Sequence, residues 1–215
     1  MKIGIIGSGV VGRVLATAFR KEGNDVMLGT RNISKEEVMK WKNENATGSL
    51  GSFQDTAQFG EIVVLAVAGL VVEDAISLAG KEHFSHKIII DATNPIAAVP
   101  PENGVLKYFT TLEESLMERI QKLIPDARVV KAFNCVGNAF MYKPQFPGGT
   151  PTMFICGNDN EAKNSVSSIL FSFGWEVEDM GKVEAARAIE PLCILWCIPG
   201  FLHNKWTHAF KLLKK

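Results

Sequence analysis

The sequence predicts an α/β protein with a doubly wound, mainly parallel β-sheet that is covered by helices on both faces. Short apolar segments alternate with segments of helical periodicity along most of the 215 residues. The segment 61–67 (EIVVLAV) is almost continuously apolar, as strands buried on both faces are. The chain is long enough for one substantial core, and 47% hydrophobic with 21% charged residues is ordinary for a globular protein.

Hydrophobic periodicity and turn residues place the elements along the chain. Strands are predicted at 2–6, 25–28, 61–67, 87–91, 127–133, 153–156 and 175–180. Helices are predicted at 10–22, directly after an N-cap at Ser34, and at 71–79, 112–124 and 160–173. Loops rich in proline or glycine are expected at 96–107 and 142–151.

The remaining residues, 183–215, predict a short helical extension that packs on the domain formed by residues 1–182. With 33 residues it is too short for an independent domain. Its basic end, KLLKK, suits the C-terminus of a helix. Its aromatic residues are expected to cover the sheet edge and an acceptor pocket, or to form a homodimer interface; they are Trp196, Phe201, Trp206 and Phe210.

Charge and hydropathy argue against several classes of protein. The 23 Lys and Arg residues balance the 23 Asp and Glu residues, so no net charge favours nucleic acid or an anionic membrane. Glycine interrupts the first apolar run before a signal peptide could form, and the apolar stretch 191–202 is too short to span a bilayer. The four cysteines lack CxxC spacing and a histidine cluster. We therefore expect no metal site and a cytoplasmic location.

A glycine-rich turn directly follows the first strand and opens the first helix. Its sequence, GSGVVG at 7–12, matches the GxGxxG pattern in the required context. Gly7 permits the tight turn, Gly9 lets the backbone approach a pyrophosphate, and Gly12 lets the helix pack closely on the strand. The helix N-terminus offers unpaired N–H groups to phosphate oxygens. This pattern predicts a Rossmann-type dinucleotide site.

The turn after the second strand favours NADP(H). NAD-selective sites carry Asp or Glu there to bind the ribose 2′-hydroxyl, whereas this chain has GTRN at 29–32. Arg31 can pair with a 2′-phosphate through its planar guanidinium. Further hydrogen-bond donors and a second positive charge are expected from Thr30, Asn32, Ser34 and Lys35. We therefore predict that residues 1–182 form an NADP-binding domain.

Seven short motifs span almost the whole chain and carry a family resemblance. They are GSGVVG (7–12), GTRN (29–32), LAVAG (65–69), DATNP (91–95), KAFN (131–134), ICGND (155–159) and ARAIE (186–190). With them the sequence resembles the NADPH-dependent coenzyme F420 reductase (deazaflavin reductase) family. It is similar also to the cytosolic NADPH-oxidising domain of six-transmembrane (STEAP-type) metalloreductases. The deazaflavin reductases commonly have proline where this chain has Ala68-Gly69.

The resemblance implies contacts with each part of the cofactor. The pyrophosphate contacts are Ser8, Gly9, Val10 and Val11, and the 2′-phosphate contacts are Thr30, Arg31, Asn32 and Lys35. The ribose and nicotinamide side is expected at Val67 and Ala68, and the nicotinamide walls at Asn94, Pro95, Ala132 and Asn134. These segments lie at carboxyl ends of parallel strands, where open α/β sheets bind ligands. For Asn134 an alternative stays open, in which its side chain satisfies its own turn.

The resemblance implies a hydride transfer between NADP(H) and a flavin-like or deazaflavin (F420) acceptor. Because the cofactors carry this chemistry and the protein positions them, no catalytic acid or base is assigned. Asp91 is expected to support its loop, and Arg187 and Glu190 to form a surface pair. Two alternatives remain: a flavin-mediated ferric or cupric reductase, and a non-catalytic NADP(H)-binding sensor or scaffold. Length argues against β-hydroxyacid dehydrogenases and pyrroline-carboxylate reductases, which carry a sizeable C-terminal helical domain.

Overall fold

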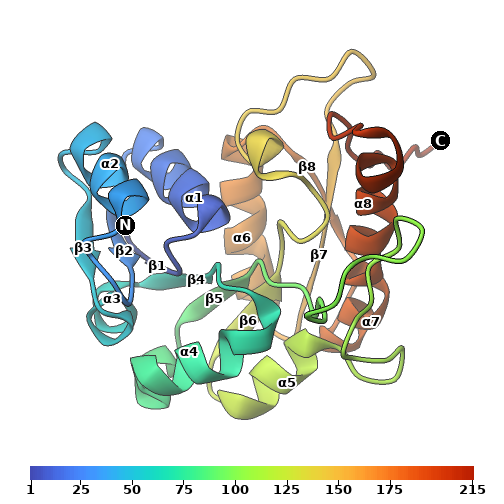
Figure 1. Cartoon of the computed structure of the whole chain (residues 1–215). Helices are drawn as coiled ribbons and strands as arrows, with labels where there is room; N and C mark the ends of the chain where they lie inside the picture. Colours follow the sequence, from blue (N-terminus) through green and yellow to red (C-terminus); the bar gives the residue numbers. More distant parts are fainter.

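The computed structural model describes residues 1–215 and contains one eight-stranded sheet in the order β3-β2-β1-β4-β5-β6-β7-β8 (Figure 1). All neighbouring strands are parallel except β6 and β7, which are antiparallel. The strands are β1 (Lys2–Ile6), β2 (Asp25–Gly29), β3 (Ser49–Gly51), β4 (Ile62–Leu65), β5 (Ile88–Asp91), β6 (Arg128–Lys131), β7 (Thr152–Gly157) and β8 (Glu176–Asp179). The predicted doubly wound, mainly parallel fold class is confirmed.

Helices cover both faces of this sheet. They are α1 (Val10–Lys21), α2 (Glu36–Glu44), α3 (Phe53–Phe59), α4 (Val72–Ala79), α5 (Leu116–Leu123), α6 (Asn160–Ser172), α7 (Ala186–Ile189) and α8 (Pro191–His203). One core joins α1, α2 and α6 to the sheet, and a second core joins α3, α4, α5 and α7 to its other face.

Alternation along each strand divides its side chains between the two cores. In β4, Ile62 and Val64 belong to the core under α1 and α6, whereas Val63 and Leu65 belong to the core under α3 and α4. The order of the strands reverses at β1, which lies between β2 and β4. Such a reversal opens a crevice at the carboxyl ends of the strands. The fold therefore places the turns after β1, β2 and β4 around one crevice.

Two elements between β2 and β4 were not predicted. They are the short edge strand β3 and the seven-residue helix α3. Ser52 caps α3 in a reciprocal capping box with Asp55, and this local bonding replaces the long apolar periodicity that would have marked a helix. The predicted N-cap at Ser34 is wrong by one position, because Lys35 precedes the first residue of α2 and no side chain caps it.

The prediction that the chain is helical to its end is also wrong. The helix α8 ends at His203, and its C-cap, Asn204, adopts the left-handed conformation with φ of 51°. The segment that follows is not helical, and Phe210 accepts a hydrogen bond from the backbone N–H of Thr152 at the start of β7. Lys211 forms a 3.0 Å ion pair with Glu176, and Lys214 pairs with Glu178. The basic residues therefore bind the acidic edge strand β8.

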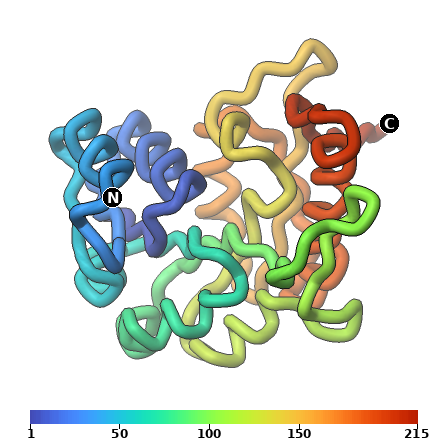
Figure 2. Tube along the Cα trace, in the orientation of Figure 1, coloured from blue at the N-terminus to red at the C-terminus, as the bar shows by residue number.

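The region 183–203 forms a longer helical run than its apolar centre suggested. The 21-residue run Val183–His203 is long and apolar enough to cross a membrane by length and composition, although 39% of its most apolar window is buried in the protein. Glu190, in the middle of this run, is buried. Here the run packs on the protein, beside the loop 96–114 that Figure 2 shows in green against the red C-terminal helix. Gly104 approaches Leu202 in this contact.

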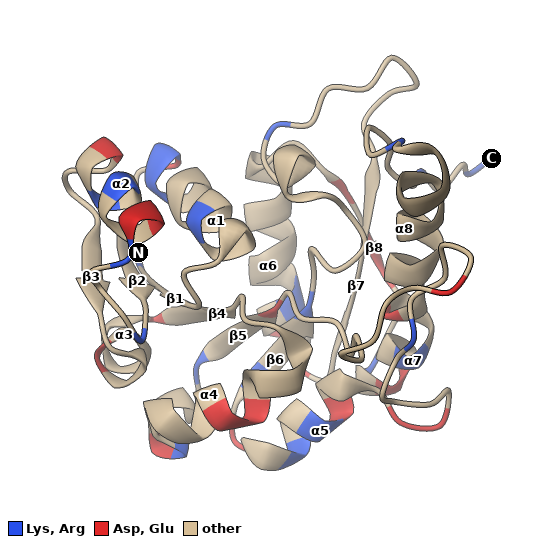
Figure 3. Cartoon of the chain, viewed as in Figure 1, with Lys and Arg blue, Asp and Glu red and all other residues tan.

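Acidic and basic residues are interspersed along the helices (Figure 3). Three of the four cysteines are buried, and Cys197 is half-buried.

Candidate dinucleotide site

The turn between β1 and α1 has the backbone geometry that its glycines predict. Gly7 adopts φ of +117°, and a Cβ there would lie 2.5 Å from the Ala66 carbonyl oxygen. A Cβ on Gly12 would lie 1.8 Å from the Gly7 carbonyl oxygen, so only glycine allows the helix to approach this closely. A Cβ on Gly9 would meet nothing within 4 Å. The turn therefore leaves open space beside Gly9, where a phosphate could approach the backbone.

The first turn of α1 borders this open space. Gly9 is the N-cap and provides no side-chain acceptor for the first amides of the helix, which include those of Val10 and Val11. No acidic residue lies in this turn. The unpaired N–H groups and the positive end of the helix dipole make this terminus suitable for an anion.

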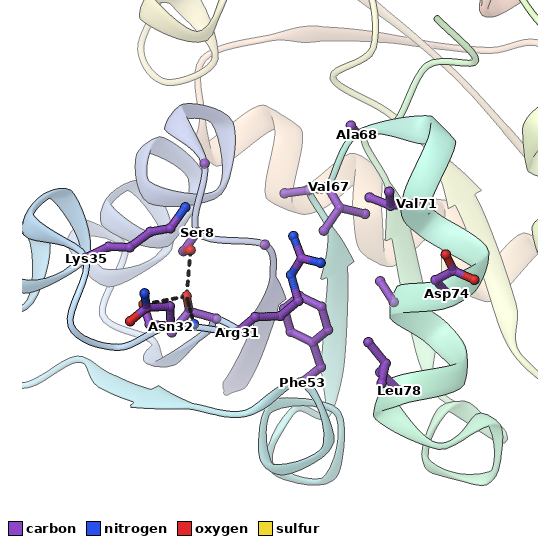
Figure 4. Close-up of a pocket in the computed structure, with 15 residues that line it drawn as sticks. Ser8, Arg31, Asn32, Lys35, Phe53, Val67, Ala68, Val71, Asp74 and Leu78 are labelled. Atoms are coloured by element: carbon purple, nitrogen blue, oxygen red, sulfur yellow. Dashed lines mark hydrogen bonds between the residues drawn. The ribbon is translucent and has the colours of Figure 1, made fainter. Parts of the chain in front are cut away.

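A cavity of about 530 Å³ extends from the glycine-rich turn across the ends of β2 and β4 (Figure 4). Nine predicted site residues line it: Gly7, Ser8, Gly9, Thr30, Arg31, Asn32, Lys35, Val67 and Ala68. Six further lining residues were not predicted: Phe53, Ala66, Val71, Asp74, Ala75 and Leu78. Phe53 was missed because α3 was missed. The α4 residues lie in a helix that was predicted, but its helical pattern alone did not indicate that one end faces a ligand site.

Hydroxyl groups fix the turn after β2 against the glycine-rich turn. The Ser8 hydroxyl donates to Thr30 Oγ1 at 2.9 Å, and Thr30 Oγ1 lies 3.1 Å from the carbonyl oxygen of Asn32. The backbone N–H of Ser34 donates to Asn32 Oδ1 at 2.9 Å. The backbone of Ser34 therefore stabilises the turn, and Ser34 does not line the cavity, so the contact of its side chain with the cofactor stays a prediction.

The cations of this turn are available to a ligand. Arg31 and Lys35 are exposed, project into the cavity in Figure 4, and form no salt bridge with any carboxylate. The carboxylate that lines the cavity, Asp74, comes from α4 on the opposite wall (Figure 4). The end of β2 thus has two free positive charges and no acid, which suits an additional phosphate on the adenosine ribose.

The predicted nicotinamide walls form a separate cluster after β5 and β6. Asn94 donates from Nδ2 to the Asn134 carbonyl oxygen at 2.7 Å, and Asn134 donates from Nδ2 to the Ile189 carbonyl oxygen at 2.9 Å. These contacts are long-range, so the alternative in which Asn134 satisfies only its own turn does not hold. Pro95 and Ala132 are buried beside them. None of these four residues lines the cavity around Arg31.

One buried acceptor in this cluster has no partner. Asn134 Oδ1 is enclosed by protein and makes no hydrogen bond, although the rest of the side chain is held in place. An unsatisfied buried acceptor costs about 1–3 kcal/mol, which a donor that reaches it would offset.

Sequence patterns did not reveal the buried ionic cluster below these asparagines. Lys131 is fully buried, and its Nζ donates to Asp91 Oδ2 at 2.9 Å, to Glu190 Oε1 at 2.9 Å and to the Thr93 carbonyl oxygen at 2.7 Å. Burial opposes the charged form of Lys131, but Asp91 and Glu190 outweigh this effect and hold its pKa above the ordinary value. Asp91 also accepts from the Thr93 N–H and hydroxyl, so its predicted support of the loop is confirmed.

The predicted surface pair between Arg187 and Glu190 is wrong. Arg187 instead forms a bidentate pair with Glu118, with an Nε–Oε2 distance of 2.9 Å. This pairing, with the hydrogen bonds from Ser115, lowers the pKa of Glu118 to about 2 against the effect of its burial. Glu190 points into the protein and has 1% exposure.

The wound sheet, the glycine-rich turn and the free cations after β2 define a Rossmann-type protein that binds NADP(H). Comparison with known proteins identifies the family. The family model for coenzyme F420-dependent NADP oxidoreductases matches residues 2–95. A solved structure described as a candidate F420-dependent NADP-reductase from Arthrobacter sp. FB24 is 32% identical over the full length of both chains, with a TM-score of 0.92. The chain belongs to this family and is an NADP-dependent oxidoreductase.

Other relatives extend this comparison. Metalloreductase STEAP3 of Rattus norvegicus is 32% identical over 206 residues, which are 94% of this chain and 39% of that protein. The chain therefore spans about two fifths of the length of this curated relative. A reductive aminase from Aspergillus terreus in complex with NADPH has 16% identity and a TM-score of 0.66, covering 94% of this chain and 63% of the other. At this level of sequence identity the similarity shows a shared fold and nothing more.

Proposed function

We propose that the protein transfers a hydride between NADP(H) and a flavin-like or deazaflavin (F420) acceptor. The observation that carries this proposal is the arrangement at the carboxyl edge of the sheet. A phosphate-binding turn and two free cations lie at one end, and a wall that includes the hydrogen-bonded Asn94 and Asn134 lies after β5 and β6. Bound NADP(H) supplies the hydride, and the protein supplies alignment and a pocket from which water is excluded.

Each part of the chain has a distinct task in this proposal. Backbone amides of Ser8, Gly9, Val10 and Val11 bind the pyrophosphate, while Thr30, Arg31, Asn32 and Lys35 bind the 2′-phosphate. Val67 and Ala68 line the ribose side. Asn94 and Asn134, with Pro95 and Ala132, form the wall against the nicotinamide. The unpaired Asn134 Oδ1 supports this assignment, because a ligand N–H that reaches it after a small movement of the wall would satisfy it.

The class of acceptor is supported by the family and tested by turnover. NADPH oxidation is followed at 340 nm without oxygen, using F420, FMN, FAD and riboflavin in turn. We expect turnover with at least one of them, and a lower kcat/KM for NADPH in Arg31→Ala at subsaturating NADPH. NADPH binding without turnover on any acceptor would contradict the proposal and favour the non-catalytic sensor or scaffold.

A second candidate function is a ferric or cupric reductase in which a freely bound flavin carries electrons to the metal. The similarity to a metalloreductase over 94% of this chain favours it. Adding ferric or cupric chelates to the same assay tests it. Metal reduction that depends on both NADPH and added flavin, at the rate of NADPH oxidation, would support this function.

The remaining expectations concern the cell and the oligomer. We propose a cytoplasmic protein that acts on a small-molecule acceptor, without nucleic acid or membrane partners, in which residues 183–215 extend the domain 1–182. We also propose a homodimer through the C-terminal segment, because α8 exposes Leu195, Phe201 and Leu202. Trp196 and Trp206 pack against each other, and Phe201 packs edge-on against Trp206 while it stays partly exposed. A clean monomer in size-exclusion chromatography with light scattering would reject the dimer.

A further inference from the structure

The buried Glu190 connects the ionic cluster to the start of α5. Its Oε2 accepts from the Leu116 N–H at 3.0 Å, and its Oε1 accepts from the Met117 N–H at 3.0 Å and from Lys131 at 2.9 Å. The carboxylate therefore satisfies two of the free amides at the helix N-terminus. Asp91 and Glu190 together carry one negative charge more than Lys131, and the positive end of α5 compensates for it. Two elements, α5 and β6, therefore fix the position of this one side chain.

The backbone beside Glu190 holds the nicotinamide wall. The Ile189 carbonyl oxygen accepts from Asn134 Nδ2 at 2.9 Å, and the Glu190 carbonyl oxygen accepts from the Tyr108 hydroxyl at 2.8 Å. The Tyr108 hydroxyl also lies 3.4 Å from Asn94 Oδ1. Both asparagines of the wall are therefore connected to the two residues whose position the ionic cluster sets.

We propose that Glu190 is a positioning residue for hydride transfer: anchored by Lys131 and by the α5 amides, it fixes the Ile189 carbonyl that orients the carboxamide of Asn134 toward the nicotinamide. This inference rests on the proposed function of the Asn94 and Asn134 wall. The ionic cluster takes no proton in the reaction. Its effect is geometric, because it restricts the rotation of an amide that would otherwise have two nearly equivalent orientations.

Stability alone explains this cluster poorly. Buried ion pairs are often no more stabilising than apolar residues of the same volume, because desolvation offsets their attraction. Apolar packing could hold the helices together, but it would not fix the Ile189 carbonyl oxygen through directional hydrogen bonds. An arrangement of five hydrogen bonds around Lys131 and Glu190 gives the backbone at 189–190 one position relative to β6.

Glu190→Gln tests the proposal in the ligand-free protein first. The variant turns one acceptor oxygen into a donor that faces Lys131 or an α5 amide, so the backbone at 189–190 must shift. The readout is the side-chain amide signal of Asn134 in a ¹⁵N–¹H NMR spectrum, assigned by its loss in Asn134→Asp. We expect this signal to move and its solvent exchange to become about tenfold faster or more.

The rate of hydride transfer in the enzyme with bound NADPH provides the second readout. In single turnovers with the acceptor found in the panel, we expect hydride transfer to slow about tenfold or more. The Kd for NADPH, which depends mainly on the adenosine end, should stay within about threefold. If no acceptor supports turnover, the proposed function fails, whereas the NMR measurement still decides whether Glu190 orients Asn134.

Lys163→Met is the matched control. Lys163 is also a buried lysine paired with a carboxylate, 2.7 Å from Asp179, with 7% of its side chain exposed. It contacts none of the proposed site residues, so its loss should lower thermal stability without moving the Asn134 signal or the transfer rate. Equal effects in Lys163→Met and Glu190→Gln would overturn the proposal, because they would indicate general loosening.

Tyr108→Phe is a milder variant that keeps the ionic cluster intact. It removes the hydroxyl that donates to the Glu190 carbonyl oxygen and lies 3.4 Å from Asn94 Oδ1, so it is expected to fold even if Glu190→Gln does not. We expect the Asn134 signal to move and hydride transfer to slow about threefold or more. An unmoved Asn134 signal with wild-type transfer in either folded variant would refute the proposal.

Discussion

Replacing Arg31 by alanine should separate NADPH from NADH. The guanidinium lies at the mouth of the cavity and pairs with no carboxylate, so its removal breaks no internal ion pair. A charge-assisted hydrogen bond to a phosphate contributes about 1.5–3 kcal/mol. We therefore expect NADPH to lose roughly 10- to 150-fold more affinity than NADH.

The exposure of this turn decides where in that range the loss falls. Arg31 is exposed, and solvent screens its charge. Lys35 lines the same cavity and keeps part of the positive potential in the variant. Both effects favour the lower end, close to 1.5 kcal/mol, or about tenfold. The selective loss should also shrink at high ionic strength, because salt screens the wild-type interaction.

Isothermal titration calorimetry with NADPH and NADH, at low and high salt, measures this difference directly. Lys40→Ala is the control, because Lys40 is an exposed lysine of α2 that pairs with Glu44 and lies outside the cavity. Its nucleotide affinities should match the wild type. An equal loss of both nucleotides in Arg31→Ala, or a wild-type preference for NADH, would refute the assignment of this turn.

Two further predictions concern the glycine-rich turn and the acid stability of the protein. Gly9→Ala should fold normally and lower the affinity for NADPH and for NADH alike by about tenfold or more, because its methyl group occupies the space open to phosphate. Gly12→Ala should instead lower the melting temperature, because its Cβ would lie 1.8 Å from the Gly7 carbonyl oxygen. Calorimetry and thermal unfolding distinguish these effects, and a normal melting temperature for Gly12→Ala would contradict the expected steric clash. The pKa of Glu118 is lowered from 4.5 to about 2, so its pairing stabilises the fold fully above pH 4.5 and loses that effect as pH falls toward 2. Arg187→Gln should therefore be less stable at pH 7 in urea unfolding and lose less stability between pH 5 and pH 2; parallel pH profiles would contradict this.

The cavity at the glycine-rich turn was predictable because short-range patterns determine it. Gly7 and Gly12 lie within one turn, and their spacing directly encodes a backbone that other residues cannot adopt. Arg31 follows β2 by two positions, so recognising the strand was enough to place its side chain at the sheet edge. Local patterns thus identified most of the polar cavity wall.

The contacts of the proposed nicotinamide wall were harder to predict, because they join distant parts of the chain. Lys131 and Glu190 are 59 residues apart, and Asn134 and Ile189 are 55 apart. Lysine and glutamate are seldom fully buried unless they are paired, and no sequence pattern indicates which residues pair. Glu190 was therefore assigned to a surface pair with Arg187, one helical turn away, and the buried partner on β6 was missed.

The two ends of the site consequently depend on charge in different ways. At Arg31 and Lys35 the charges lie in solvent, so salt weakens what they contribute to nucleotide affinity. Lys131, Asp91 and Glu190 are enclosed by protein, where salt screens far less, and their charges act on each other. Raising the ionic strength should then increase the KM for NADPH while the rate of hydride transfer at saturating cofactor stays nearly constant. A transfer rate that fell together with affinity would mean that the exposed turn, and not the buried cluster, controls how the nicotinamide is held.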